Sequence, residues 1–361
     1  MKCAVGSRFR ATGWRRRWRF EGRGWGVEAT VERELDPTAR PTGLSRFTLL
    51  SRFTLLAHPC FHGAYFLWSC HFPTPKGPVA VTVKTASRPT PRPFLKWAGG
   101  KTGLLAELLE RVEAAQPFST YFEPFIGGGA LFFELARLDR LPGRAVLSDA
   151  NPNLVSAYLG VRDHVDAVIR ALRRHRNLHS RDHYYAVRDA APRSLPARAA
   201  RVIYLNRTCF NGLYRENSRG QFNVPMGRYE NPRICDESNL RECSQALQPA
   251  QVAVKPFQHV LEAARPGDFV YFDPPYHPLS KTSSFTAYAS GGFGEKDQRH
   301  LADVFAQLST RGVKCLLSNS MTELVRHLYA DFTIEEVYAP RSVNSRPDRR
   351  GKIPEALVRN F

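Results

Sequence analysis

A carboxylate, two prolines and a tyrosine follow an apolar run in the last third of the chain. The segment VYFDPPY, residues 270–276, ends with Asp273, Pro274, Pro275 and Tyr276. Because neither proline has a backbone N–H, the segment cannot extend a sheet ladder, and its oxygen atoms remain free to accept hydrogen bonds. A rigid row of acceptors beside an aromatic face suits a flat ligand that carries an amino group. The alternative is a strand that ends at a sheet edge with a tyrosine packed on the core, and so short a motif needs its context to decide.

A glycine-rich turn is the second candidate site. In FEPFIGGGALFFE, residues 122–134, three glycines lie between a predicted strand and a predicted helix, where they allow a ligand to approach the backbone closely. Asp149 follows Gly129 by twenty residues, at the tip of the next predicted strand, where a carboxylate can accept hydrogen bonds from a ribose diol. We therefore expect the two strand ends to hold a nucleoside, with an ordinary strand–turn–helix connection as the alternative.

The segment KWAGGK, residues 96–101, precedes these motifs and is followed by a threonine. A phosphate-binding loop is excluded, because that motif requires a glycine where this chain has Leu95. Trp97 and Lys101 can instead line a nucleoside pocket, since an indole packs on a flat ring and an ammonium group attracts a carboxylate. Purely structural roles are the alternative for both side chains.

Arginine and asparagine residues alternate in LNRTCFNGLYRENSRGQFNVPMGRYENP, residues 205–232. An arginine fork matches O6 and N7 of guanine, and asparagine matches N6 and N7 of adenine, so a hairpin that carries both can read a major groove. Turn signals at residues 211–212 and 219–220 favour such a hairpin, although a solvated surface loop would look similar. A second basic loop, residues 341–352, is expected to contact phosphates. The alternating residues are Arg207, Arg215, Arg219, Arg228, Asn206, Asn211, Asn217 and Asn223.

Strand and helix patterns alternate around the candidate sites. Apolar residues recur at helical spacing over residues 102–115, and a second helix is predicted over residues 130–138. Strands are predicted for TYFEPF, AVLSDA, DFVYF, VKCLLSN, FTIEEVYA and EALVRNF, and the order strand, glycine turn, helix, strand begins a doubly wound sheet. We therefore predict an α/β fold with a Rossmann-like sheet formed by residues 93–150 and 255–361. Residues 151–254, with Arg-rich helical stretches and the hairpin, are predicted to form an inserted recognition domain.

The chain is strongly basic, as expected for a protein that binds a polyanion. Its 361 residues carry a formal net charge of +19, and the pI is about 10.0. Residues 1–92 hold 16 basic and 5 acidic residues, and the rest of the chain remains basic, with 36 against 28. The seven cysteines form no CxxC pair and no framework spacing, which favours a reducing cytoplasm.

Residues 1–92 differ in composition from the rest of the chain. They contain the hexamer SRFTLL twice, at residues 45–56, and an uncharged run at residues 53–75 whose histidines and prolines argue against a membrane span. Histidines and cysteines in this run lack the spacing of a zinc finger. We expect residues 1–92 to be a basic extension of low order, and the sequence leaves open whether the native protein contains it.

The four motifs occur in the order found in a known enzyme family. KWAGGK, FEPFIGGG, NRTCFNGLYRENSRGQFNVPMG and DPPYHPLSKTSSFTAY together resemble the Dam-type DNA adenine-N6 methyltransferases, the alpha group of the D12 class. The resemblance covers the chain from about residue 93 to residue 361. It implies a methyltransferase that uses S-adenosylmethionine to methylate N6 of a flipped adenine in duplex DNA, with GATC as the first expectation for the target.

The resemblance also assigns roles to individual residues. Asp273 and the carbonyl of Pro274 would accept the two N–H bonds of adenine N6, and Tyr276 would stack on the base. The expected catalytic residues are Asp273, Pro274, Pro275 and Tyr276. The expected cofactor-binding residues are Trp97, Lys101, Glu123, Phe125, Gly127, Gly129, Asp149 and Asp273. The expected DNA-binding residues are Arg207, Asn211, Arg215, Asn217, Arg219 and Pro225, with Arg219 as the main candidate for a guanine contact.

The resemblance implies double-stranded DNA as the partner, no metal, no membrane, a monomer in solution and a cytoplasmic protein associated with the nucleoid through DNA. Cytosine-N4, RNA adenine and glutamine-directed protein methyltransferases share the [DN]PPY motif and remain alternatives. Asp273 disfavours the protein-directed enzymes, and the basic insert favours duplex DNA. An inactive DNA-binding relative and a membrane-anchored form are further alternatives. The sequence leaves open the target sequence, a preference for hemimethylated DNA and the existence of a partner nuclease.

Overall fold

The computed structural model describes residues 3–10, 13–22, 25–32, 90–97, 100–278, 293–340 and 352–361. The chain divides into two units, Met1–Ser87 and Arg88–Phe361. The first unit contains an antiparallel sheet in the order β1-β2-β3, in a part of the chain that the sequence predicted to be of low order. The tandem hexamer and the uncharged run lie outside the described residues. The strands are β1 Cys3–Arg10, β2 Gly13–Gly22 and β3 Trp25–Glu32.

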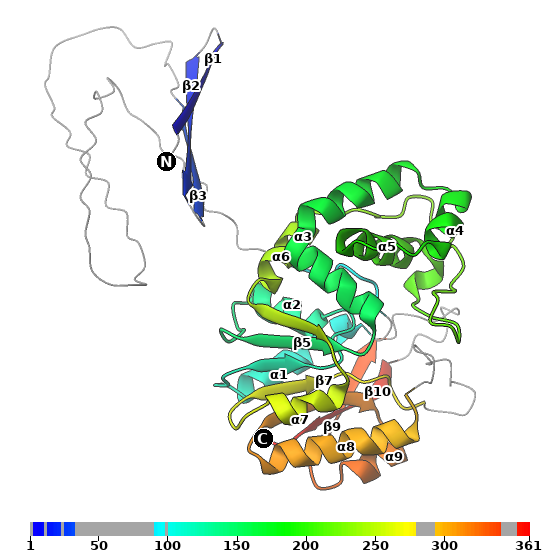
Figure 1. The fold of residues 1–361 in the computed structure, drawn as a ribbon. Helices are drawn as coiled ribbons and strands as arrows, with labels where there is room; N and C mark the ends of the chain where they lie inside the picture. The colour runs from blue at the N-terminus through cyan, green and yellow to red at the C-terminus, as the bar shows by residue number, and fades with distance from the viewer. Residues whose placement is uncertain are drawn as a thin grey trace, which may run out of the picture. The chain divides into compact units, whose positions relative to one another are not determined.

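The second unit is built on a seven-stranded sheet in the order β6-β5-β4-β7-β8-β10-β9 (Figure 1). Neighbours from β6 to β8 pair in parallel, whereas β10 runs antiparallel to both β8 and β9. The strand order reverses between β4 and β7, and a doubly wound sheet opens a crevice for ligands at the carboxyl ends of its strands there. The strands are β4 Tyr121–Glu123, β5 Ala145–Asp149, β6 Ala250–Val254, β7 Phe269–Phe272, β8 Lys314–Ser320, β9 Thr333–Pro340 and β10 Lys352–Arg359.

This architecture confirms the predicted α/β fold with a Rossmann-like sheet. The six predicted strands are present, and the two predicted helices correspond to η1 with α1 and to α2. The structure differs from the prediction at the end of the insert. Residues 250–254 form β6 and pair with β5, so they belong to the sheet and not to the insert. Its sequence, AQVAV, has the short apolar pattern of a strand, but the predicted boundary at residue 254 left it in the insert. The helical elements are η1 Lys101–Gly103, α1 Leu105–Ala114 and α2 Ala130–Arg137.

Alternate residues of the strands face two separate hydrophobic cores. Tyr121 and Phe269 lie in the core that α1 and α2 cover, whereas their neighbours Phe122 and Val270 lie in the core under α7, α8 and α9. Successive side chains of a strand point to opposite faces, so a sheet with apolar residues at every position needs helices on both faces. The elements of the second layer are η3 Phe257–His259, α7 Val260–Ala263, α8 Glu295–Thr310 and α9 Glu323–Leu328.

A helical insert lies between β5 and β6 (Figure 1). Its first helix, α3, begins at Pro152, and the Oδ1 atom of Asn151 caps it by accepting hydrogen bonds from the backbone N–H groups of Asn153 and Leu154. The predicted Arg-rich helical stretches are confirmed. No helix in the described ranges is long and apolar enough to span a membrane. The helices are α3 Pro152–Asn177, α4 Arg181–Asp189, α5 Leu195–Thr208, η2 Phe210–Gly212 and α6 Glu237–Leu247.

The predicted hairpin is a folded loop with little strand pairing. Two isolated bridges join its arms, one between Cys209 and Met226 and one between Glu216 and Phe222. The predicted turn is present, closed by a 2.9 Å backbone hydrogen bond across residues 217–220. Asparagine and glycine disfavour strands, so the segment keeps the turn of a hairpin without a continuous ladder. We call residues 209–226 the recognition loop below.

Helices α3 and α5 approach each other closely at Gly160. A Cβ atom at this position would lie 2.3 Å from the Cβ of Ala199, which is much closer than two non-bonded carbon atoms can come. Glycine is therefore the residue that lets the two helices meet.

We predict that Gly160→Ala lowers the free energy of unfolding by about 1–2 kcal/mol, because overpacking a core costs about 1–3 kcal/mol and the gain in helix propensity offsets only part of it. Urea unfolding followed by circular dichroism measures the change. Gly143→Ala is the control, since a Cβ there would meet nothing within 4 Å. Equal losses in the two variants would contradict the packing explanation.

Candidate active site

Asp273 lies at the centre of a polar network at the carboxyl end of β7. The Nζ atom of Lys101 is 2.7 Å from Oδ1 of Asp273, and the hydroxyl of Ser318 donates a 3.0 Å hydrogen bond to the same oxygen. Lys101 is only 5% exposed, so the ion pair is shielded from water. Burial raises the pKa of the Asp273 carboxyl above its ordinary value, and Lys101 and Ser318 oppose that rise. Asp273 and Ser318 meet because β7 and β8 are parallel neighbours that end side by side.

Two acceptors on this loop receive no hydrogen bond from the described residues. They are Oδ2 of Asp273 and the carbonyl oxygen of Pro274, whereas the carbonyl of Pro275 accepts a 2.9 Å hydrogen bond from Nε2 of Gln298. The row of unpaired acceptors predicted from the two prolines therefore reduces to two atoms in adjacent residues.

Two buried amides hold the loop that carries Asp273. Oδ1 of Asn319 accepts a 3.0 Å hydrogen bond from the backbone N–H of His277, and its Nδ2 donates a 2.9 Å bond to Oε1 of Gln298. Gln298 and Asn319 are both 0% exposed, and buried amides with their partners in place rigidify the structure around them. The backbone is thus anchored to α8 and β8 on both sides of Tyr276.

Tyr276 is restrained at its hydroxyl and at one face of its ring. The hydroxyl donates a 2.6 Å hydrogen bond to Oε2 of Glu355 on β10, and Nζ of Lys101 lies 4.5 Å from the ring centroid. Burial raises the pKa of Tyr276 well above its ordinary value, and the charges of Asp273 and Glu355 add to the rise. The hydroxyl therefore remains protonated and acts as a donor.

The glycine-rich turn lies against Trp97. Gly127 has a φ of +46° and Gly129 a φ of +66°, in the left-handed region that favours glycine. A Cβ at Gly127 would lie 2.8 Å from Cδ1 of Trp97, so a side chain at this position would displace the indole. The N–H of Gly127 donates a 3.4 Å hydrogen bond to Oδ2 of Asp149, which brings the turn and the predicted ribose-binding carboxylate together.

Asp149 is held at the end of β5 by backbone donors. Its Oδ1 accepts a 2.9 Å hydrogen bond from the N–H of Asn151. Burial raises the pKa of Asp149 to about 6, and the backbone donors of Asn151, Gly127 and Ala150 oppose the rise. The group is a carboxylate above that pH and can accept hydrogen bonds from a ligand in the crevice.

Glu123 and Phe125, which the resemblance places beside the cofactor, have internal contacts here. Glu123 is 2% exposed, and its Oε2 accepts a 2.8 Å hydrogen bond from the hydroxyl of Tyr121. Burial raises the pKa of Glu123 to about 8, so its carboxyl is mostly neutral at pH 7. The ring of Phe125 packs against Phe257 and Phe293, with centroid distances of 5.3 and 5.7 Å. Both side chains are thus engaged with neighbouring protein groups in this structure.

The recognition loop contacts the glycine-rich turn through Trp97. The ring of Tyr214 stacks on Trp97 at a centroid distance of 5.1 Å. The hydroxyl of Tyr214 donates to Oε1 of Glu216, and Nδ2 of Asn153 donates a 3.0 Å hydrogen bond to the same oxygen. A continuous set of contacts therefore joins the recognition loop to the crevice.

Arg207 is placed differently from the other predicted DNA-binding residues. Its guanidinium donates hydrogen bonds of 3.0 and 2.7 Å to the carbonyl of Phe94, and burial lowers its pKa. Its neighbour Asn206 pairs with the backbone of Lys96 at 2.7 and 2.6 Å. Both side chains attach the segment that contains Trp97 to α5.

The other predicted DNA-binding residues lie on the recognition loop. Asn217 shapes its turn, because its Oδ1 accepts 3.0 Å hydrogen bonds from the N–H groups of Arg219 and Gln221. Arg215 donates a 2.8 Å hydrogen bond to Oδ1 of Asn223. The turn therefore presents Arg219 to solvent. The exposed members of the predicted set are Asn211, Arg215, Arg219 and Pro225.

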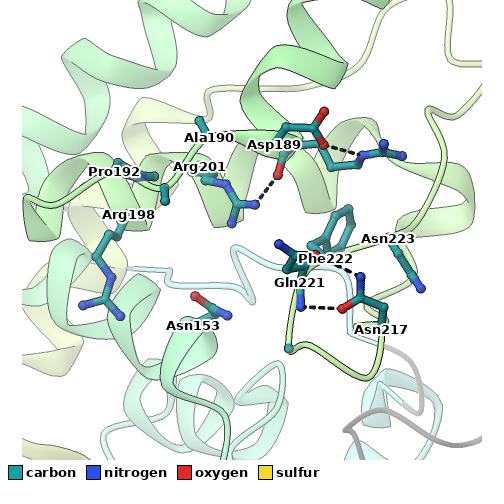
Figure 2. A pocket seen from close by; sticks show the side chains of 13 residues that line it. Asn153, Asp189, Ala190, Pro192, Arg198, Arg201, Asn217, Gln221, Phe222 and Asn223 are labelled. Atoms are coloured by element: carbon teal, nitrogen blue, oxygen red, sulfur yellow. Dashed lines mark hydrogen bonds and ion pairs between the residues drawn. The ribbon is translucent and has the colours of Figure 1, made fainter.

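A cavity of about 580 Å³ lies beside this turn (Figure 2). Its wall includes Arg188, Arg198 and Arg201 from the helical side and Gln221 from the recognition loop. Arg201 donates hydrogen bonds to the backbone carbonyls of Val187 and Arg188 at 2.9 and 2.5 Å. The cavity is basic and does not include the loop that carries Asp273.

Four residues of the site were not found from the sequence. Ser318 and Asn319 lie in the polar ending of VKCLLSNS, and polar residues at the carboxyl end of a buried strand are a signal that could have identified them. Gln298 on α8 and Glu355 on β10 carry no such signal, since only the tertiary fold brings them to the loop.

The remaining predictions concern the second basic loop and a metal site. The second basic loop lies outside the described residues over positions 341–351. Within the described ranges, no group of three or more His, Cys, Asp and Glu side chains is arranged to hold a metal ion.

Known proteins resemble most of the second unit. A family profile described as "D12 class N6 adenine-specific DNA methyltransferase" matches residues 97–343. The Type II methyltransferase M1.LlaDCHI of Lactococcus lactis subsp. cremoris is 42% identical over 280 residues, covering 75% of this chain and 95% of the relative. The Type II methyltransferase M.MjaIII of Methanocaldococcus jannaschii is 40% identical, with coverage of 75% and 99%. The DNA adenine methylase of Escherichia coli strain K12 is 35% identical, with coverage of 74% and 94%.

The raised pKa of Glu123 predicts a pH dependence of stability. The contribution of this group is fully present below its ordinary pKa of 4.5 and is lost as the pH rises through about 8, because the buried carboxyl resists ionisation. We predict that Glu123→Gln makes the free energy of unfolding fall less steeply between these two pH values than in the wild type. Urea denaturation across the range measures this, with Glu110→Gln, 79% exposed, as the control. Parallel profiles for the wild type and Glu123→Gln would contradict the assignment.

Proposed function

Because the chain belongs to the D12 class of N6 adenine-specific DNA methyltransferases, we propose that it transfers a methyl group from S-adenosylmethionine to N6 of an adenine flipped out of duplex DNA, with GATC as the target. The observation that carries the proposal is the pair of acceptors on the loop after β7 that receive no hydrogen bond from the described residues. An exocyclic amino group has two N–H bonds, and Oδ2 of Asp273 and the carbonyl of Pro274 are two acceptors in adjacent residues.

The two acceptors match what adenine N6 needs in order to react. Its lone pair is delocalised into the ring, so it is a weak nucleophile. Hydrogen bonds from N6 to Asp273 and Pro274 would favour a pyramidal nitrogen whose lone pair projects out of the plane of the ring. Inside a duplex the same amino group is paired and stacked, so the base must be flipped out at a cost of roughly a few kcal/mol.

The proposed cofactor is S-adenosylmethionine, and the residues at the ends of β4, β5 and β7 are its proposed binding site. The left-handed glycines let the turn lie close against Trp97, and Asp149, which is bonded to the N–H of Gly127, would offer a carboxylate to a ribose diol. Trp97 and Lys101 would hold the methionine half. When bound, the cofactor supplies an electrophilic methyl group on its sulfonium. The substrate and the cofactor are then held in one orientation, and positioning of this kind supplies much of an enzyme's acceleration.

Lys101 connects the two halves of the proposed site. Its ammonium pairs with Asp273 and lies over the ring of Tyr276. Pairing opposes the effect of burial on the pKa of Asp273, and an ionised carboxylate accepts hydrogen bonds more strongly than a neutral group. Lys101 thus favours the form of Asp273 that can orient an amino group.

The recognition loop is the proposed reader of DNA sequence. Arg219 is exposed at the tip of a turn that the amide of Asn217 fixes, and a fixed turn lets a guanidinium approach a base edge in one orientation. Asn211, Arg215 and Pro225 would lie close to the same DNA. Arg207 is proposed to act indirectly, by holding the segment that carries Trp97.

We predict that Asp273→Ala abolishes the formation of N6-methyladenine in duplex DNA, because the variant lacks one of the two acceptors for N6. Purified protein is incubated with S-adenosylmethionine and unmethylated DNA, and the digested nucleosides are quantified by mass spectrometry. Asp331→Asn, an exposed carboxylate on the turn before β9, is the control. N4-methylcytosine in place of N6-methyladenine, or methylation of RNA alone, would contradict the proposed substrate.

We predict that Arg219→Ala weakens discrimination at one guanine of the target by about 1–3 kcal/mol, the usual contribution of an arginine fork. The measurement compares kcat/KM for a GATC duplex with that for duplexes in which the guanine is replaced. Arg144→Ala is the matched control, because Arg144 is also exposed but precedes the amino end of β5. Unchanged preference in the Arg219 variant would exclude this residue as the guanine reader.

A further inference from the structure

Glu355 reaches the candidate active site from β10, the strand that runs antiparallel to its neighbours β8 and β9. It lies on β10, where its Cα partner on β8 is Ser320, and none of the four sequence motifs contains it. Its Oε2 accepts the 2.6 Å hydrogen bond from the hydroxyl of Tyr276 across 79 positions of the chain. The pair therefore forms only when the sheet is complete.

The contact is partly shielded from water and has a fixed direction. Burial raises the pKa of Glu355, with the hydroxyl of Tyr276 and the charge of Lys101 opposing the rise and Asp273 adding to it. The pKa of Tyr276 is also raised by burial, so the phenol remains protonated and donates the hydrogen bond to Glu355. A hydrogen bond between a hydroxyl and a carboxyl group in such surroundings is stronger than one at the surface.

Two contacts restrain the ring of Tyr276 from different directions. Glu355 holds the tip of the ring, and the ammonium of Lys101 lies 4.5 Å from the centroid over one face. Lys101 is itself held by Asp273 at 2.7 Å. Lys101 thus lies over one face of the ring, so a flat ligand that stacks on Tyr276 would have to use the opposite face.

We propose that Glu355 is a positioning residue that holds the ring of Tyr276 in the orientation in which it stacks on the flipped adenine. This inference rests on the proposed function of the site. A ring that is ordered before the base arrives loses less conformational freedom on stacking, so binding energy is retained for orienting the base. Glu355 acts through Tyr276 and touches neither the base nor the cofactor.

The chain contains a matched pair for comparison. On the neighbouring strand β9, the hydroxyl of Tyr338 donates a 2.7 Å hydrogen bond to Oε1 of Glu336. Tyr338 is 56% exposed, and the hydrogen bonds of this pair to described residues involve Arg326 and not residues 273–278. Glu336→Ala thus removes the same kind of contact from the same sheet outside the site.

The experiment is a double-mutant cycle with Glu355→Ala, Tyr276→Phe and the combination of both, together with Glu355→Gln. Single-turnover methylation rates and DNA affinities are measured for each variant. In parallel, the fluorescence of 2-aminopurine placed at the target position reports on stacking of the flipped base without any chemical step. Thermal unfolding shows whether each variant is folded.

Glu355→Ala should lower the single-turnover rate about tenfold or more, as expected from loss of a hydrogen bond to a charged group. The double variant should be no slower than Tyr276→Phe alone, because both changes remove one interaction. The three variants should share one 2-aminopurine intensity that differs from that of the wild type. Glu355→Gln, which keeps an acceptor oxygen, should recover part of the rate, and Glu336→Ala should behave as the wild type.

Additive losses in the double variant would overturn the proposal, as would a wild-type 2-aminopurine signal in a slow but folded Glu355→Ala protein. The wild type is assayed first in the same experiment. If it forms no N6-methyladenine in duplex DNA, the proposed function fails; if it does and Glu355→Ala is equally fast, only the role of Glu355 fails.

Discussion

The buried ion pair between Lys101 and Asp273 is the interaction on which the candidate site depends. A buried carboxylate without a partner is costly, so Asp273 can lie at the end of β7 only with a cation beside it. The same ammonium closes one face of Tyr276, and the segment that leads to Lys101 carries the indole that lies against Gly127. One charge thus links the loop after β7, the glycine-rich turn and the chain that precedes α1.

The sheet explains why these groups converge. β4 and β7 are parallel neighbours at the point where the strand order reverses, so the glycine-rich turn and the loop with Asp273 leave the same edge. β8 adds Ser318 and Asn319 to this edge, and the antiparallel β10 brings Glu355 to it. The recognition loop is joined to this edge through the stacking of Tyr214 on Trp97, so the loop and the candidate active site are in direct contact.

Local patterns in the sequence predicted six of the seven strands of the sheet, the glycine turn and the loop of Asp273 with its two prolines, because each depends on neighbouring residues. They did not identify Gln298 and Glu355, which reach the loop only through helix packing and an antiparallel pairing across 79 positions. Edge strand β6 was assigned to the insert because only its pairing with β5, and not its short sequence AQVAV, shows that it belongs to the sheet. Arg207 was predicted to bind DNA, but its guanidinium is bonded to the carbonyl of Phe94. The sequence alone does not distinguish an arginine that holds the backbone from an exposed one that can reach DNA.

The most direct test of this account is a crystal structure of the protein with duplex DNA that contains GATC and a non-reactive analogue of S-adenosylmethionine. The predicted result is a flipped adenine whose N6 lies within hydrogen-bonding distance, about 2.7–3.2 Å, of both Oδ2 of Asp273 and the carbonyl of Pro274, with the base stacked on the face of Tyr276 opposite Lys101. An adenine that remains stacked in the duplex, or an N6 atom bonded to other groups while these two acceptors face solvent, would contradict it.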